Sequence, residues 1–261
     1  SAIGRNAEAR ALTPDPNNTV IAHGDDASAR IDGGANNTAS AIGVGASALA
    51  TRGDGNTAEA EGDGASATAT SGNSTASAIG RNAEARALTP DPNNTAIAHG
   101  DDASAQIDGG ANNTASAIGV GASARVTSGS GNTATAVGVD AGAVAGFNDG
   151  NTAEAEGDGA RAAATGGNST ASAIGQNADA NSLTPDANNT AIAHGDGASA
   201  RITSGSNNTA RALADGASAV AGGGDNNTAT ADIVNGSAEA TGNDNTATNC
   251  SAVGSNVSCS V

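Results

Sequence analysis

Apolar and polar residues alternate along the chain in short runs that return at a regular spacing. In residues 38–42 and 46–50, alanine fills every second position, while the positions between are polar or aliphatic. An alternation of period two predicts a β-strand with one buried face. Glycine at 43 and the Asp-Gly-Asn run at 54–56 predict bends, because these residues favour turns. Each unit of this pattern therefore predicts two short strands joined by a bend and followed by a turn.

The units share the frame N-T-A-x-A-x-G-x-x-A-x-A-x, and its threonines lie 18 to 20 residues apart. A fixed period near 20 is typical of a solenoid, whereas disorder does not require the phase to be held along a whole chain. We predict an all-β, elongated parallel β-solenoid (a β-roll or β-helix) of about 14 coils, with about 19 residues in each. Its thin core would be lined by alanine, and residues 1–261 would form a single repeat domain. The frame threonines are Thr19, Thr38, Thr57, Thr75, Thr95, Thr114, Thr133, Thr152, Thr170, Thr190, Thr209, Thr228 and Thr246.

Composition narrows the class of function. The chain has 38 Gly, one Phe, no Met, Trp or Tyr, and a formal net charge of -17. Such acidity argues against nucleic acid as a partner, because phosphate binding needs cationic side chains. No apolar run is long enough to cross a membrane as a helix, so we expect no membrane insertion.

Large duplications argue against catalysis. Residues 1–48 return as 77–124 with only two differences, and GNTAEAEGDGA occurs at 55–65 and 150–160. A catalytic site is normally unique in a chain, whereas here most local groups of residues recur. We therefore expect no enzyme activity, no cofactor and no metal site. Paired carboxylates at Glu59 with Glu61 and at Glu154 with Glu156 are interpreted as surface or interface charge.

The asparagine before most frame threonines has the parity of an inward position. Buried amides need partners, so we predict a stacked asparagine ladder that satisfies the backbone of the turn. The ladder residues are Asn18, Asn37, Asn56, Asn94, Asn113, Asn132, Asn151, Asn189, Asn208 and Asn227.

Most of the scarce large aliphatic residues have the parity of outward positions on the first strand. A contiguous apolar stripe on a surface usually marks an interface, so we predict self-association with copies of the same chain. The alternative is that another wall of the protein covers these residues. His23, His99 and His194 lie in the same stripe and are interpreted as surface polar residues, or as rings formed by symmetry-related copies. The predicted self-association face comprises Ile21, Ile42, Ile79, Ile97, Ile118, Val137, Ile174, Ile192 and Leu213.

The C-terminal coil, residues 245–261, holds the two cysteines. We predict a disulfide between Cys250 and Cys259 that would close this coil, with free thiols as the alternative. A disulfide, together with the absence of methionine, predicts a processed protein in an extracellular or cell-surface location.

Several turns contain the N-x-S/T acceptor sequence for glycosylation, although repetition of one turn would also produce it. The glycosylation candidates are Asn17, Asn36, Asn73, Asn93, Asn112, Asn188, Asn207 and Asn226.

The units NTASAIGVGASALA (37–50) and STASAIGRNAEARA (74–87) resemble the head repeats of YadA-like trimeric autotransporter adhesins. The resemblance covers most of the chain at the level of short Ala/Gly motifs. It implies a left-handed parallel β-roll, three chains around one axis, and adhesion to host or neighbouring cell surfaces. The repeat here is longer than in that family, and the sequence shows neither its heptad stalk nor its membrane anchor.

These patterns lead to one main prediction of function. We predict a structural subunit of an extracellular fibre or surface filament, which assembles through open solenoid ends and the Ile-rich lateral face. The first alternative is the head of a trimeric surface adhesin. A remote alternative is an ice-binding solenoid, since the frame threonines form one regular column but no second one accompanies it.

Overall fold

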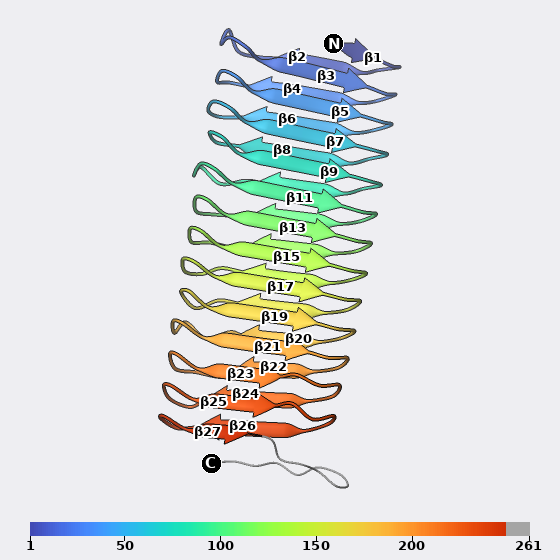
Figure 1. Cartoon of the computed structure of the whole chain (residues 1–261). Coiled ribbons are helices and arrows are strands. Elements are labelled where there is room, and N and C mark those ends of the chain that lie inside the picture. Colours follow the sequence, from blue (N-terminus) through green and yellow to red (C-terminus); the bar gives the residue numbers. More distant parts are fainter. Residues whose placement is uncertain (249–261) are drawn as a thin grey trace. The chain divides into compact units, whose positions relative to one another are not determined.

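The computed structural model describes residues 1–248. It confirms the predicted all-β parallel β-solenoid, with about 13 turns of roughly 19 residues and no helix among the described residues. By proximity of Cα atoms the chain divides into two compact units, residues 1–131 and residues 132–261. We describe each unit separately. In both, successive strands alternate between an odd-strand sheet and an even-strand sheet, which form the two walls of the coil (Figure 1).

Unit 1 contains β1 to β14, with neighbouring strands of each sheet parallel. Its odd-strand sheet is built from β1 (Ala2–Ile3), β3 (Thr19–His23), β5 (Thr38–Ile42), β7 (Thr57–Glu61), β9 (Thr75–Ile79), β11 (Thr95–His99) and β13 (Thr114–Ile118). Its even-strand sheet is built from β2 (Glu8–Ala11), β4 (Ser28–Asp32), β6 (Ser47–Thr51), β8 (Ser66–Thr70), β10 (Glu84–Ala87), β12 (Ser104–Ile107) and β14 (Ser123–Val126).

Unit 2 repeats this arrangement with β15 to β27. Its odd-strand sheet is built from β15 (Thr133–Val137), β17 (Thr152–Glu156), β19 (Thr170–Ile174), β21 (Thr190–His194), β23 (Thr209–Ala212), β25 (Thr228–Ala231) and β27 (Thr246–Thr248). Its even-strand sheet is built from β16 (Gly142–Ala145), β18 (Arg161–Ala164), β20 (Asp179–Ser182), β22 (Ser199–Ile202), β24 (Ser218–Gly222) and β26 (Ser237–Thr241).

Strand register keeps like residues stacked. Thr95 pairs with Thr114, and Ala96 and Ala98 pair with Ala115 and Ala117. Side chains alternate between the two faces of a strand, so every alanine of this frame points into the coil and every frame threonine points outward. Both alanines of β11 are fully buried, whereas Thr95 is half-buried. Each outward position therefore forms a column that runs from coil to coil.

The core of each unit is lined mainly by alanine, as predicted. Small side chains suit it because they let the two sheets approach closely and pack without voids. Sequence analysis missed four larger core residues, each in the last inward position of an even strand: Ile31, Ile107, Val126 and Ile202. Their parity matches Ala50 of the frame, and this was the signal that could have identified them.

Two turns close each coil. The turn from an odd to an even strand begins with glycine, as at Gly100, where φ is 136° and an added Cβ would meet the carbonyl oxygen of Gly119. The returning turn places Asn or Gly at positive φ, as at Asn93 (φ 62°) and Asn112 (φ 59°). Asparagine tolerates this left-handed conformation better than most residues, so local sterics explain its recurrence there.

The Leu-Thr-Pro-Asp turns share one hydrogen-bond pattern. In the turn at 183–186, the Thr184 hydroxyl donates to Asp186 at 2.7 Å, and the Gly205 amide of the next coil donates to the same carboxylate at 2.8 Å. These two hydrogen bonds lower the pKa of Asp186 below its ordinary value of 3.8. The turns at 13–15 and 89–91 repeat the pattern, so the proline turns hold successive coils together rather than interrupting them.

Candidate self-association face

At the C-terminal end of each odd strand, one outward residue stacks on its equivalents in the neighbouring coils. We call this column the outer column, and it is formed by the residue four positions after each frame threonine. In unit 1 the strand register stacks these residues directly on one another, and aliphatic and ionisable side chains alternate. From the N-terminal side the outer column of unit 1 reads His23, Ile42, Glu61, Ile79, His99 and Ile118, and the exposed Ile3 of β1 stacks on His23 at its start.

Unit 2 has an outer column of the same kind. Val137, Glu156, Ile174 and His194 stack through the register of β15, β17, β19 and β21. Leu213 and Asp232 continue the column directly after β23 and β25, and the Leu213 amide donates to the carbonyl of Ala231 at 2.8 Å.

All nine residues of the predicted self-association face lie on the outside of their unit. Ile42, Ile118 and Ile174 are 44%, 43% and 39% exposed. The other six are half-buried: Ile21, Ile79, Ile97, Val137, Ile192 and Leu213. Ile21, Ile97 and Ile192 stand two residues before the histidines, so each histidine adjoins an aliphatic residue in its own strand and others in the neighbouring coils. The face is therefore a set of apolar clusters, each surrounding an imidazole.

The glutamates of this face form no ion pair with the other described residues. Within residues 1–248, Glu59, Glu61, Glu154 and Glu156 are exposed and form no ion pair. The His23 ring lies 3.5 Å from the Ser1 hydroxyl, and the His194 ring lies 3.4 Å from the Ser172 hydroxyl. The three histidines lie on separate coils, and in the described part of the chain no three potential ligands gather to hold a metal ion.

The even-strand sheet of unit 1 treats its charges differently. Its arginines pair with carboxylates at short range, as in Arg30 with Asp32 at 2.7 Å and Arg125 with Asp108 at 2.6 Å, whereas Arg161 and Arg201 of unit 2 form no ion pair within residues 1–248. Arg86 pairs with Glu84 at 2.8 Å in the same way. Exposed pairs of this kind contribute little stability, but in unit 1 they give each even-strand arginine a carboxylate partner.

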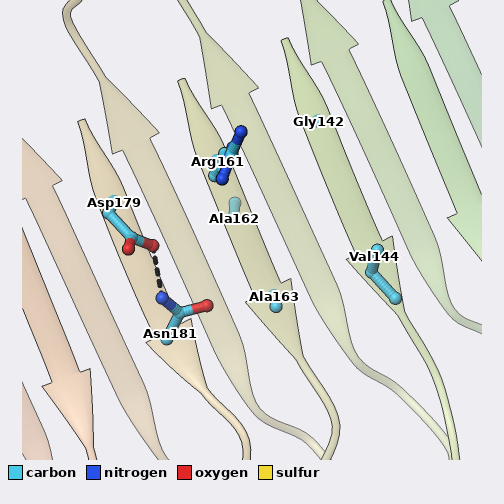
Figure 2. A pocket seen from close by; sticks show the side chains of 7 residues that line it. All are labelled: Gly142, Val144, Arg161, Ala162, Ala163, Asp179 and Asn181. Atoms are coloured by element: carbon cyan, nitrogen blue, oxygen red, sulfur yellow. Dashed lines mark hydrogen bonds between the residues drawn. The ribbon is translucent and has the colours of Figure 1, made fainter. Parts of the chain in front are cut away.

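A shallow hollow lies on the even-strand sheet of unit 2. Its volume is about 320 Å³, and small residues at Gly142 and Ala163 create it where bulkier side chains stand elsewhere in the sheet. Figure 2 shows Asp179 hydrogen-bonded to Asn181 at one side, with Arg161 and Val144 around the rest. A single carboxylate that already accepts a hydrogen bond from its neighbour gives this hollow no paired acid and base, so it is a weaker candidate than the odd-strand face.

No protein-family model, no curated protein and no solved structure matches the chain. The resemblance to adhesin head repeats therefore stays a prediction from short motifs. No helix of the described residues is long and apolar enough to span a membrane.

The predicted ladder asparagines stack at the returning turn. In unit 1, the Asn56 amide donates to Oδ1 of Asn37 at 2.7 Å, and the Asn113 amide donates to Oδ1 of Asn94 at 3.0 Å. The side-chain amides donate to turn carbonyls, as from Asn94 Nδ2 to the carbonyl of Asp91 at 2.7 Å and to that of Gly110 at 2.9 Å. In unit 2 the same backbone-to-side-chain contact joins Asn132 to Asn151, Asn189 to Asn208, and Asn208 to Asn227.

The ladder is interrupted and extended at positions that sequence analysis did not name. Ser74 and Ser169 replace asparagine where the frame reads N-S-T. The Ser74 hydroxyl is buried without a hydrogen-bond partner among the described residues, whereas the Ser169 hydroxyl accepts from the Asn189 amide at 3.3 Å. Asn245 adds one more step beyond Asn227, at 3.2 Å.

The glycosylation candidates occupy the exposed positive-φ position of the returning turn. Several bond to the next coil through their side chains, as from Asn17 Nδ2 to Asn36 Oδ1 at 3.2 Å and from Asn93 Nδ2 to Asn112 Oδ1 at 3.3 Å. This position of the returning turn is occupied by Asn, Gly or Asp, which are residues that positive φ favours. The other candidates have the same backbone conformation: Asn73, Asn188, Asn207 and Asn226. Glycosylation stays a prediction, and the proposed Cys250–Cys259 disulfide lies outside the described residues.

Proposed function

We propose that this protein is a structural subunit that associates with copies of itself through the outer face of the odd-strand sheet, building an extracellular fibre or surface filament. The observation that carries the proposal is the placement of large aliphatic side chains. The core consists mainly of alanine, yet nine aliphatic residues of the odd-strand sheets and the positions beside them point outward in repeating clusters. A protein with so few large apolar residues exposes them at a cost unless another surface covers them.

Burial of these residues would supply the driving force for assembly. Covering apolar surface contributes roughly 25 cal/mol per Å². Each single cluster is small, but the clusters recur along both units on one face, so contacts would add up along the solenoid. Association of this kind requires no catalytic group, which agrees with the duplication of most local residue patterns.

A filament adds end-to-end contacts to the lateral one. Strand edges at the end of a stack of coils can pair with further strands, and head-to-tail pairing that does not close produces a filament. The extracellular setting of the proposal rests on the two cysteines. Three chains around one axis would use the same face, so an adhesin-like trimer is the competing outcome of the test below.

Negative-stain electron microscopy of the purified chain, combined with light scattering, tests the proposal. We expect assemblies whose mass is a multiple of 24.2 kDa and, at high protein concentration, long fibres of uniform width. Discrete particles with the mass of three chains would favour the adhesin-like trimer over the fibre. Particles with the mass of one chain at every concentration would contradict self-association altogether.

A further inference from the structure

The odd strands of unit 1 carry an unusual set of ionisable side chains. No lysine or arginine occurs in β1, β3, β5, β7, β9, β11 or β13. The ionisable residues of these strands are two glutamates on β7 and two histidines, one on β3 and one on β11, and all of them point outward. Histidine is therefore the only residue of these strands whose side chain can become a cation. The four residues are Glu59, Glu61, His23 and His99.

These groups do not neutralise one another within the chain. Strand register places Ile42 and Ile79 on either side of Glu61, so that each histidine lies two coils away. Two coil steps span roughly 10 Å, which is beyond ion-pair distance. Within residues 1–248 neither the glutamates nor the histidines form an ion pair. Two carboxylates give the odd strands of unit 1 a charge of about −2, and two protonated imidazoles bring it to about zero.

We propose that protonation of the histidines switches on self-association through the odd-strand face, so that assembly strengthens as the pH falls from 8 to about 5.5. The inference rests on the self-association proposed above and assigns its regulation. A second copy that covers the face removes Glu59 and Glu61 from water, and a covered carboxylate without a cation is strongly unfavourable. Both copies bring histidines to the contact, and imidazolium is the cation that the odd strands of unit 1 can supply.

The size of the two possible proton-binding steps identifies histidine as the group that responds. Glutamate ordinarily binds a proton near pH 4.3, so neutralising one carboxylate at pH 7 lowers the apparent affinity about 500-fold. Histidine ordinarily binds a proton near pH 6.5, so about a quarter of the imidazoles are protonated at pH 7 and the loss is only about fourfold. At pH 5.5 the loss from histidine almost disappears. The charge of the covered face is therefore balanced by histidine rather than by protonated glutamate.

The charged groups near His99 lie in the turns. Its own strand and the neighbouring β9 and β13 contribute uncharged side chains, including Ile79 and Ile118. These aliphatic neighbours oppose protonation, but the imidazole is exposed and keeps its water before assembly. Carboxylates outnumber cations in the adjacent turns, which favours the protonated form. The charged groups around His99 are Arg81, Asp101 and Asp102.

His23 has the same kind of surroundings at the N-terminal end of the sheet. The strands β1 and β5 beside it carry no charged side chain. The Ser1 hydroxyl lies 3.5 Å from the ring, and the Asp25 carboxylate accepts from the Arg5 amide at 2.8 Å in the adjacent turn. The charged groups around His23 are the Ser1 amine, Arg5, Asp25 and Asp26.

Unit 2 follows the same rule with one added cation. Its odd strands carry two glutamates on β17, one histidine on β21 and one arginine on β23, and an aspartate follows β25. Protonation of the histidine changes the charge of this set from about −2 to about −1. The neighbouring turns again hold aspartates, and the His194 ring lies 3.4 Å from the Ser172 hydroxyl. The charged groups around His194 are Arg211, Asp196 and Asp215.

Sedimentation velocity of the full chain at pH 8 and pH 5.5, at one ionic strength, tests the inference. Assembly takes up protons, so it should be favoured by falling pH, and we expect the dissociation constant to fall at least about tenfold from pH 8 to pH 5.5. Glutamates stay largely ionised over this range. In a triple variant the constants at the two pH values should agree within about threefold, because no imidazole remains. Its substitutions are His23→Gln, His99→Gln and His194→Gln.

A second variant balances the face without histidine. Glu59→Gln together with Glu61→Gln removes both carboxylates from the odd strands of unit 1, so association at pH 8 should be at least about tenfold tighter than that of the native chain. Glu84→Gln together with Asp108→Asn is the matched control. It changes the net charge by the same amount on the even-strand sheet of the same unit, and we expect no change in association.

The outcomes separate this inference from the proposed function. Circular dichroism and thermal unfolding first confirm that each variant is folded at both pH values. A native chain that sediments as a monomer at every pH contradicts self-association itself. Association that is equal at the two pH values, or weaker at pH 5.5, overturns the switch while self-association stands. The switch is also overturned if the triple glutamine variant keeps the native pH dependence, or if the even-strand control tightens association as much as the glutamate variant.

Discussion

The two sheets of unit 1 share one backbone pattern and one alanine-lined interior, yet the charges of their outer faces differ. On the even-strand sheet, arginines pair with carboxylates within the chain, as Arg125 does with Asp108. On the odd-strand sheet, Glu59 and Glu61 form no ion pair within residues 1–248. The comparison teaches that two faces of one coil can share a backbone pattern and still carry paired charges on one side and unpaired charges on the other.

Aliphatic residues follow the same division. Outward aliphatics of the even strands are scattered, as at Leu49 and Val220, and polar or charged residues stand beside them in the neighbouring coils. In the outer column of each unit they recur at every second coil, as at Ile79 and Ile118 in unit 1. Regular spacing, rather than total apolar content, distinguishes the face that we assign to assembly.

Changing one aliphatic residue of the outer column should have the largest effect on self-association. We expect Ile118→Arg to raise the dissociation constant of self-association at least about 30-fold, because a central apolar contact becomes a buried unpaired charge. Val220→Arg adds the same charge to the even-strand face and serves as the matched control, with no change expected. Sedimentation velocity of both variants measures the effect, and equal weakening by the two substitutions would contradict the assignment of the face.

The ladder should affect stability rather than assembly. Asn94→Ala removes a buried amide that donates to the carbonyls of Asp91 and Gly110 and accepts from the Asn113 amide. Unpaired buried groups cost about 1–3 kcal/mol each, so we expect the free energy of unfolding to fall by about 2–3 kcal/mol in urea denaturation. Asn93→Gly is the control, since glycine keeps the positive φ of that exposed position. A fall of the same size in the control would show that the turn, not the buried amide, carries the stability.

The smallest effect should come from the paired charges of the even-strand sheet. Arg125 and Asp108 lie on the surface, and exposed ion pairs contribute about 0–1 kcal/mol. We expect Arg125→Gln to lower the free energy of unfolding by less than about 1 kcal/mol and to leave the sedimenting mass unchanged. Loss of assembly in this variant would mean that the even-strand face also takes part in the interface.

The periodicity of the sequence was sufficient to predict the solenoid, its strand pairs and its alanine interior, because each coil repeats the same alternation. The parity of Asn94 and its equivalents likewise predicted a buried amide at the turn. Ile31 and Ile202 were not recognised as core residues, although each has the parity of an inward alanine position of the frame. The structural role of Asn93 was also not recognised, because asparagine at this position suits both a glycosylation acceptor sequence and a positive φ.

The mass of the native chain in solution tests the central claim most directly. Sedimentation equilibrium at pH 6, over a wide range of protein concentration, measures it without surfaces or stains. Self-association through the odd-strand face predicts a mass that rises from 24.2 kDa to twice that value or more, and that returns toward 24.2 kDa in the Ile118→Arg variant. A constant mass of 24.2 kDa for the native chain would contradict the account.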